Sequence, residues 1–332
     1  MKKRSIIFIV AMALVILAQV NSLAQAGQND PTFNPSDVGF SYGDGPDADP
    51  WVAMTQNDGK ILVGGFFRVY DGIARMGIAR LNNDGSLDNS FDPGSGIDEW
   101  RNITSIAVQS DGKVIIAGSF YMFNGLARNQ IARLNSDGSI DTSFDAGDAP
   151  YLQHILGIQS VAIQEDGKIL IVESSRVTRL NQDGSLDKSF DTGKGTDLGS
   201  TKVVVQPDGK ILLAGYFTSF NGTAVNNILR LNEDGSLDQT FNTPLRRNDF
   251  NRATNITLQT DGKMLIMGMF RTDDNPPKEQ IVRLNVDGTL DSSFAVDSVS
   301  RPTHIAVQGD GKIVIVSAVV GRDPLTNKDT GP

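Results

Sequence analysis

The chain has 332 residues, of which 39% are hydrophobic and 21% charged, so it is long enough for one large all-β domain or two ordinary domains, and its composition argues against disorder. The net charge is −9, and phosphate backbones and anionic lipids repel an acidic protein, so we expect no nucleic-acid partner and no peripheral membrane binding. The sequence contains no cysteine, which excludes disulfides, thiolate metal sites and cysteine nucleophiles.

Residues 1–26 predict a secretory signal peptide. Basic residues at positions 2–4 precede an apolar run of about 15 residues, and Ala24, Gln25 and Ala26 form a small-residue cleavage site. The alternative is a membrane anchor, but this run is shorter than the roughly 20 residues of a spanning helix. We therefore expect cleavage after Ala26, a secreted or cell-envelope location, and no membrane association afterwards. Loss of the three basic residues would take the net charge from −9 to −12.

Two short motifs alternate along residues 27–332. The tripeptide Asp-Gly-Lys begins at Asp58, Asp111, Asp166, Asp208, Asp261 and Asp310. A second motif, Asp-Gly-Ser or Asp-Gly-Thr, begins at Asp84, Asp137, Asp183, Asp234 and Asp287. The first motif precedes the second by 26 residues in four copies and by 17 in the third, and the full period is about 53 residues. Such a period is typical of repeat architectures.

Each repeat predicts four short strands. In the second copy these are 103–109, 114–120, 130–135 and 139–145, rich in β-branched residues and separated by Asp-Gly turns. Four antiparallel strands per repeat are typical of a propeller blade. A β-solenoid has shorter repeats, and a β-sandwich would not repeat its sequence. We therefore predict an all-β protein, a β-propeller of about six four-stranded blades.

The third copy and the two ends of the chain depart from the repeat. The third copy lacks nine residues between its second and third strands, so we expect a surface loop there in the other copies. Residues 30–35 match the fourth-strand motif at 87–93, so we expect an N-terminal strand that closes the last blade. The sixth copy has two strands but no third. The last blade is therefore degenerate, or the sequence is a fragment; the abrupt tail favours a fragment.

These motifs resemble the delta-60 repeat family of bacterial secreted proteins. The shared core is QxDGKILVxGxF followed by RLNxDGSLDxSFD, and it recurs across about residues 28–320. The resemblance implies a β-propeller on exported proteins, with no assigned activity.

The sequence shows no catalytic motif. Its two histidines, His154 and His304, fall in different blades, and no nucleophile triad, zinc-protease motif or phosphate-binding loop is present. We therefore expect a chain that is not an enzyme and holds no cofactor or metal. One alternative is a hydrolase or lyase that uses carboxylates in the central channel.

The repeated turns offer a second alternative. Residues 82–88 place oxygen-bearing side chains around a glycine, as a calcium loop does, but they lack the chelating glutamate. We expect these residues to cap the turn instead. The alternative is a calcium-stiffened structural module of a larger adhesin.

One phenylalanine recurs in each fourth strand, which predicts core packing between blades. These residues are Phe91, Phe144, Phe190, Phe241 and Phe294.

The connections between blades diverge from copy to copy, so they are the predicted ligand-binding surface. Aromatic and arginine side chains are favoured at binding hot spots. Those in the connections are Trp100, Arg101, Tyr151, Arg246, Arg247 and Phe250. Ordinary loop packing is the alternative role. We expect an exported binding or scaffold propeller that engages a protein or a glycan through these residues.

Overall fold

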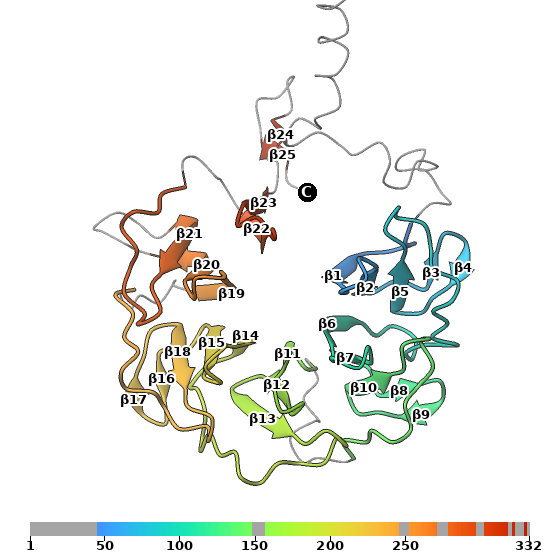
Figure 1. The fold of residues 1–332 in the computed structure, drawn as a ribbon, viewed down its shortest axis with the longest axis horizontal. Helices are drawn as coiled ribbons and strands as arrows, with labels where there is room; N and C mark the ends of the chain where they lie inside the picture. Colours follow the sequence, from blue (N-terminus) through green and yellow to red (C-terminus); the bar gives the residue numbers. More distant parts are fainter. Residues whose placement is uncertain are drawn as a thin grey trace, which may run out of the picture.

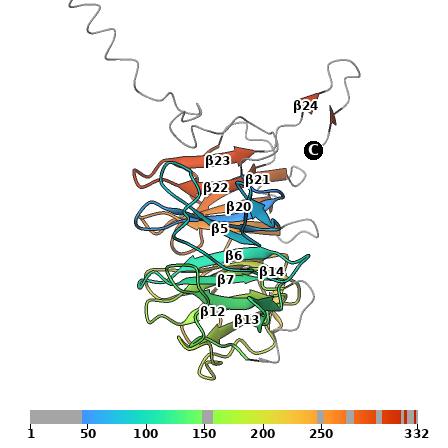
Figure 2. The ribbon, with the colours of Figure 1, turned by 90° about the vertical axis from the view of Figure 1, so that its right-hand side faces the viewer.

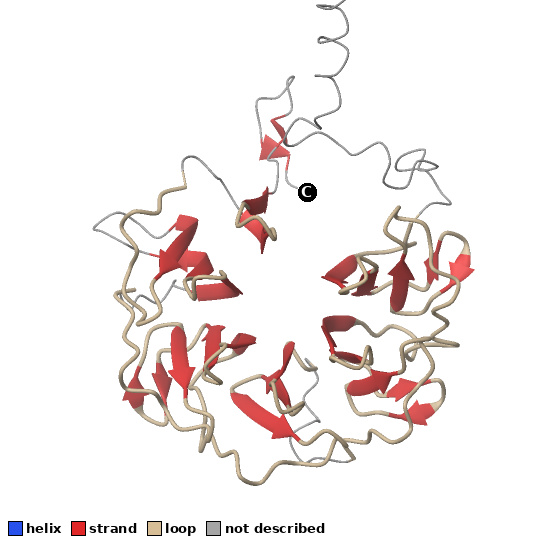
Figure 3. Cartoon of the chain, viewed as in Figure 1, coloured by secondary structure: helices blue, strands red, loops and turns tan. Residues whose placement is uncertain are grey.

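The computed structural model describes residues 45–147, 157–245, 252–270, 278–296, 302–317, 321–322 and 329–330. These residues form strands, turns and loops without a helix (Figure 3). Within the same ranges there is accordingly no helix of the length and hydropathy needed to cross a membrane. The predicted signal peptide at 1–26 and the predicted closing strand at 30–35 lie outside the described residues.

Six antiparallel sheets follow one another along the chain. The first contains β1 (Pro50–Thr55), β2 (Ile61–Gly65) and β5 (Ile78–Leu81), and the second contains β6 (Ile103–Val108), β7 (Val114–Gly118) and β10 (Ile131–Leu134). The third contains β11 (Ser160–Ile163), β12 (Ile169–Glu173) and β13 (Arg176–Leu180), and the fourth contains β14 (Ser200–Val205), β15 (Ile211–Gly215) and β18 (Ile228–Leu231). The fifth contains β19 (Arg252–Leu258), β20 (Met264–Phe270) and β21 (Lys278–Leu284), and the sixth contains β22 (Pro302–Val307) and β23 (Ile313–Ser317).

The sheets are arranged around a central axis in chain order, the architecture of a β-propeller (Figure 1). The first strand of each sheet is the innermost, and the first strands of successive sheets contact one another. Viewed from the edge, the strands run across the thickness of the disc (Figure 2). The first and sixth sheets lie at the two ends of the described arc. The predicted all-β fold of repeated antiparallel sheets is confirmed.

The insert between the second and third strands folds into a small hairpin. These hairpins are β3 (Val69–Tyr70) with β4 (Ile73–Ala74), β8 (Met122–Phe123) with β9 (Leu126–Ala127), and β16 (Ser219–Phe220) with β17 (Thr223–Ala224). The third sheet lacks the hairpin, because Ser174 and Ser175 join its strands directly. A further pair, β24 (Gly321–Arg322) and β25 (Asp329–Thr330), follows the sixth sheet.

The predicted fourth strand is wrong as a strand. In the second sheet only one residue of this segment bridges the third strand, Ile140 opposite Leu134. The physical reason lies in the next residue. The Asp141 carboxylate accepts hydrogen bonds from the backbone N–H and the hydroxyl of Ser143, at 2.9 and 2.6 Å, which turns the chain away from the sheet.

The core lies between neighbouring sheets. Leu62 of the first sheet packs in one cluster with Ile103 and Ile106 of the second, and the same pattern repeats around the arc. Phe91, Phe144 and Phe190 are buried, as the repeat predicted, whereas Phe241 and Phe294 are partly buried against their clusters. Burial of side chains of this size contributes about 2 kcal/mol each, so the stacking of sheets is the main source of stability.

A buried arginine joins each of the first four sheets to its successor. In the first sheet the Arg80 Nε donates to Asp88 Oδ2 at 2.7 Å, and one Nη donates to the backbone oxygen of Ser136 in the next sheet at 2.6 Å. The guanidinium lies over the Phe91 ring at 4.8 Å. Lys60, the lysine of the Asp-Gly-Lys turn, donates to the same Asp88 oxygen at 2.7 Å.

The same set recurs in five sheets. Its members are Lys60, Arg80, Asp88 and Phe91; Lys113, Arg133, Asp141 and Phe144; Lys168, Arg179, Asp187 and Phe190; Lys210, Arg230, Asp238 and Phe241; and Lys263, Arg283, Asp291 and Phe294. We call each set a clamp. The arginine's hydrogen bond to the next sheet repeats in the second, third and fourth sheets.

The clamp keeps its aspartate ionised. Burial alone would raise the pKa of Asp88, but hydrogen bonds from Lys60, Ser90 and Arg80 outweigh it and hold the pKa well below its usual value. A lowered pKa in the folded state means that the clamp's contribution to stability is complete at neutral pH. It is lost only as the pH falls below the unfolded-state pKa and through the folded-state value.

The clamp predicts the effect of neutralising its aspartate. Asp88→Asn leaves the buried Arg80 without a counter-ion, so we expect the free energy of unfolding to fall by roughly 3–5 kcal/mol in urea denaturation. The control is Asp58→Asn, which changes an exposed aspartate in the neighbouring turn and should cost less than about 1 kcal/mol. Equal losses in the two variants would contradict a central role for the clamp.

Candidate binding site

The connections that lead into the first, second and fourth sheets share one anchoring aspartate. Asp47, Asp98 and Asp197 each accept two backbone N–H groups from the insert hairpin of their sheet, at 2.7–3.0 Å. Burial alone would raise the pKa of Asp197, but a hydrogen bond from the Thr218 hydroxyl, together with these backbone bonds, lowers it to about 2. The connections can therefore be compared residue by residue from this anchor.

The connection into the second sheet is two residues longer than the others. Asp47 lies three residues before Pro50, which pairs with Gly65, and Asp197 lies three residues before Ser200, which pairs with Gly215. Asp98, by contrast, lies five residues before Ile103, which pairs with the equivalent Gly118. Because both ends are fixed, the extra residues must project from the connection. The sequence there is Glu99, Trp100, Arg101 and Asn102.

Trp100 lies at the tip of this projection. Its residue surface is 74% exposed, and its backbone φ is 62°, in the left-handed region that disfavours residues other than glycine. The indole lies 6.5 Å from the Phe66 ring, and the Arg68 guanidinium lies over it at 5.6 Å. A large apolar side chain is therefore held in solvent at a cost in backbone strain, a combination found at ligand-binding sites.

Arg101 is fixed beside Trp100. Its guanidinium lies 3.5 Å from the Asp98 carboxylate and 4.7 Å from the centre of the Tyr121 ring. The side chain is half-buried, so the salt bridge contributes at most about 1 kcal/mol to stability. Its main effect is to orient the guanidinium.

A cavity of about 70 Å³ lies next to Trp100. It is lined by Asp47, Ala48, Phe66, Phe67, Arg68, Met76, Asp98, Glu99, Trp100 and Arg101. The loops next to β2 and β5 of the first sheet and the connections leading into the first and second sheets contribute to this lining. We call Trp100, its neighbours and this cavity the Trp100 site.

Of the six residues predicted to bind a ligand, the structure brings together two, Trp100 and Arg101. Tyr151, Arg246, Arg247 and Phe250 lie outside the described residues, as does His154. His304 lies on β22 and is exposed. Sequence reasoning missed Phe66, Arg68 and Tyr121, because they belong to the second-strand ends and hairpins and not to the connections.

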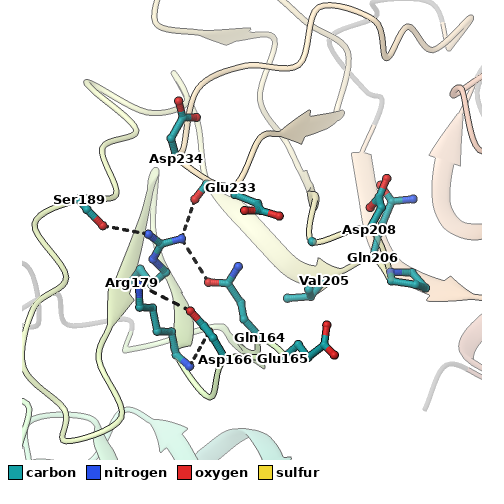
Figure 4. A pocket seen from close by; sticks show the side chains of 13 residues that line it. Gln164, Glu165, Asp166, Arg179, Ser189, Val205, Gln206, Asp208, Glu233 and Asp234 are labelled. Carbon is teal, nitrogen blue, oxygen red and sulfur yellow. Dashed lines mark hydrogen bonds and ion pairs between the residues drawn. The ribbon is translucent and has the colours of Figure 1, made fainter.

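A second concavity lies at the opposite end of the inner strands, among the Asp-Gly turns of the third and fourth sheets (Figure 4). Its volume is about 1160 Å³. Arg179 crosses its wall and donates to Ser189 at 3.2 Å, to the Glu233 backbone oxygen at 2.6 Å and to Gln164 at 3.4 Å. Several exposed carboxylates line it, including Glu165, Asp208 and Glu233.

The turn aspartates act as caps. Asp84 accepts hydrogen bonds from the Ser86 backbone N–H at 3.0 Å and from its hydroxyl at 2.6 Å. The Ser86 hydroxyl and backbone lower the pKa of Asp84. A lowered pKa is the reverse of what a general acid needs. Across the described ranges no three residues among histidine, aspartate and glutamate are grouped as a metal site would require.

Several solved structures share this architecture. Virginiamycin B lyase from Staphylococcus aureus is 17% identical, with a TM-score of 0.46 over 78% of this chain and 89% of that one. PorZ, a surface component of the type-IX secretion system of Porphyromonas gingivalis, is 14% identical, with a TM-score of 0.52 over 81% of this chain and 37% of that one. The extracellular domain of a one-component system from B. thetaiotaomicron is 13% identical, with a TM-score of 0.51 over 82% and 32%. At these identities the likeness shows the fold alone. No curated protein sequence matches this chain.

The prediction that the chain is not an enzyme is wrong. It excluded an enzymatic activity because the sequence shows no catalytic motif. Solved structures similar to this chain include streptogramin B lyases and a gluconolactonase from Xanthomonas campestris, which are enzymes. The physical reason is that a propeller can bring together residues from several blades. A search for motifs along the sequence does not detect such a group.

The backbone of Trp100 predicts an unusual response to glycine. Because φ is positive there, we expect Trp100→Gly to be more stable than Trp100→Ala by about 1 kcal/mol in urea denaturation. Leu198, exposed in the equivalent connection of the fourth sheet, is the control. At that position the glycine variant should be the less stable of the two. The same order at both positions would contradict strain at Trp100.

The family comparison agrees with the clamps. The family described as a β-propeller domain of unknown function, DUF5122, matches residues 56–91, 109–144, 164–190, 206–241 and 259–294. These five segments cover about half of the chain, and each contains one complete clamp. The matches stop short of the Trp100 connection, which lies between the first two of them. The chain belongs to the DUF5122 β-propeller family, whose repeat is of the delta-60 type.

Proposed function

We propose that this protein is an exported binding propeller that engages an extracellular macromolecule through the Trp100 site. The observation that carries the proposal is Trp100 itself, which is 74% exposed on a projection that the first and fourth connections lack. Tryptophan and arginine are the residues most enriched at binding hot spots. The projection adds nothing to the clamps, and we attribute its strained backbone to the binding of a ligand.

Export follows from residues 1–26 in this proposal. A basic start, a short apolar run and a small-residue site are the parts of a cleaved signal. The mature protein then begins at Gly27, which mass spectrometry of the exported chain tests.

We expect Trp100→Ala to weaken binding to the cell surface. The measurement is retention of the purified chain on immobilised envelope polysaccharide and, separately, on immobilised envelope protein, both from the cells that produce the chain. The matched control is Leu198→Ala, which truncates an exposed side chain of the equivalent connection. Trp100→Ala should lower the affinity at least tenfold for one of the two surfaces, while Leu198→Ala leaves it unchanged. Equal retention of both variants would contradict the proposal.

Ring closure by the N-terminal segment is part of the same proposal. The inner strand β1 is largely exposed, and Val314 and Val316 of the sixth sheet are 44% and 54% exposed. The equivalent residues of the second sheet, Ile115 and Ala117, are fully buried against the third. The motif at 30–35 contains Phe33, the counterpart of Phe91, Phe144 and Phe190, which are buried in their copies.

If Phe33 occupies such a site, Phe33→Ala should destabilise the protein as much as Phe144→Ala does, by roughly 3–5 kcal/mol. Thermal and urea denaturation of the two variants measure this. A wild-type stability for Phe33→Ala beside a large loss for Phe144→Ala would show that the segment does not close the ring.

A further inference from the structure

We propose that the Trp100 site binds a neutral carbohydrate, a chain of hexopyranose units. The inference rests on the proposed function and narrows its ligand to one chemical class. It follows from three properties of the site: a flat exposed aromatic ring, a set of fixed planar polar groups of nearly balanced charge, and a cavity that admits only a small group.

The aromatic ring is a surface for stacking. The faces of an indole carry partial negative charge, so they attract the C–H hydrogens on the apolar side of a pyranose ring. Arg68 and Phe66 hold the indole in place, at 5.6 and 6.5 Å from its ring. With 74% of its surface exposed, Trp100 offers an area that a sugar ring can cover.

The polar groups around the ring suit hydroxyl groups. Asp47 and Asp98 are fixed by backbone N–H donors, and Arg101 is fixed by Asp98. Carboxylates and guanidinium groups are planar and form paired hydrogen bonds, a geometry that matches two adjacent hydroxyls of a sugar. Each group keeps hydrogen-bonding capacity beyond these internal bonds.

The charge of the site favours a neutral ligand. Three carboxylates, those of Asp47, Asp98 and Glu99, face two guanidinium groups, those of Arg68 and Arg101. The two signs nearly cancel and are interspersed. The carboxylates would repel a polyanion, and the guanidinium groups would repel a polycation. The hydroxyls of a polyol can donate hydrogen bonds to the carboxylates and accept them from the guanidinium groups.

The size of the cavity disfavours a protein anchor. A volume of about 70 Å³ holds only a few water molecules. The aromatic and aliphatic anchors of protein interfaces need larger pockets, because they bury about 150–250 Å² each when aromatic. A hydroxymethyl group fits the volume and can hydrogen-bond to Asp47 or Arg68. The site therefore fits a hexose with its ring on Trp100 and its exocyclic arm in the cavity.

Intrinsic fluorescence can report on this site directly. The chain has two tryptophans, so Trp51→Phe leaves Trp100 as the single tryptophan, which is excited selectively over the tyrosines. This variant is titrated with hexaoses of glucose linked β-1,4 or β-1,3, of mannose and of galactose, and iodide quenching is measured at each step. At least one hexaose should shift the emission of Trp100 and lower its quenching by iodide.

Calorimetry with that hexaose then tests the role of the side chain in the otherwise unmodified chain. Trp100→Ala should lower the affinity at least tenfold, Trp100→Phe should lower it less, and Leu198→Ala should leave it unchanged. If none of the hexaoses alters the emission while retention on envelope protein still depends on Trp100, the carbohydrate inference is overturned and the proposed function stands. If neither measurement depends on Trp100, both are overturned.

Discussion

The guanidinium of the third-strand arginine bonds within its own sheet and to the next one. In the first sheet Arg80 binds Asp88 and Ser90 and covers Phe91, and its remaining nitrogen reaches the Ser136 carbonyl of the second sheet. The sheets have no disulfide to join them, because the sequence has no cysteine. Their relative position therefore depends on apolar packing and on this polar contact. Each clamp also needs its lysine, since two cations around Asp88 keep the carboxylate ionised in a buried place.

The clamp explains why the repeat motif reads as it does. The lysine of Asp-Gly-Lys and the clamp aspartate are 28 residues apart in four copies, and the arginine and that aspartate are 8 apart in all five. The third copy loses its hairpin, yet Lys168 and Arg179 still bind Asp187. The motif residues thus form the contacts that hold the sheets together, and the segments outside the motif are free to differ between copies.

The pairing of the first and second strands and the repeat could be predicted from the sequence, because Asp-Gly turns and β-branched runs are local signals, whereas the insert was predicted only as a loop. The fourth segment could not, since its departure from the sheet depends on a capping bond between Asp141 and Ser143 that competes with strand pairing. The fixed spacing of lysine, arginine and aspartate was the available signal for the clamp. Trp100 and Arg101 were found from the divergence of the connections. The positive φ of Trp100 and its contacts with Phe66 and Arg68 depend on residues distant in sequence, and no local pattern encodes them.

We propose that the scaffold and the ligand site are separate parts of the chain, and shortening one connection tests that separation most directly. Deleting Trp100 and Arg101 together gives the second connection the length found in the fourth, where Leu198 and Gly199 join Asp197 to the strand. Urea denaturation and surface binding would be measured on the same preparation. The account predicts a free energy of unfolding within about 1 kcal/mol of that of the unmodified protein, because only the Arg101 salt bridge and the strain at Trp100 are removed, and a complete loss of binding. Unfolding of the deletion variant, or binding equal to that of the unmodified protein, would contradict it.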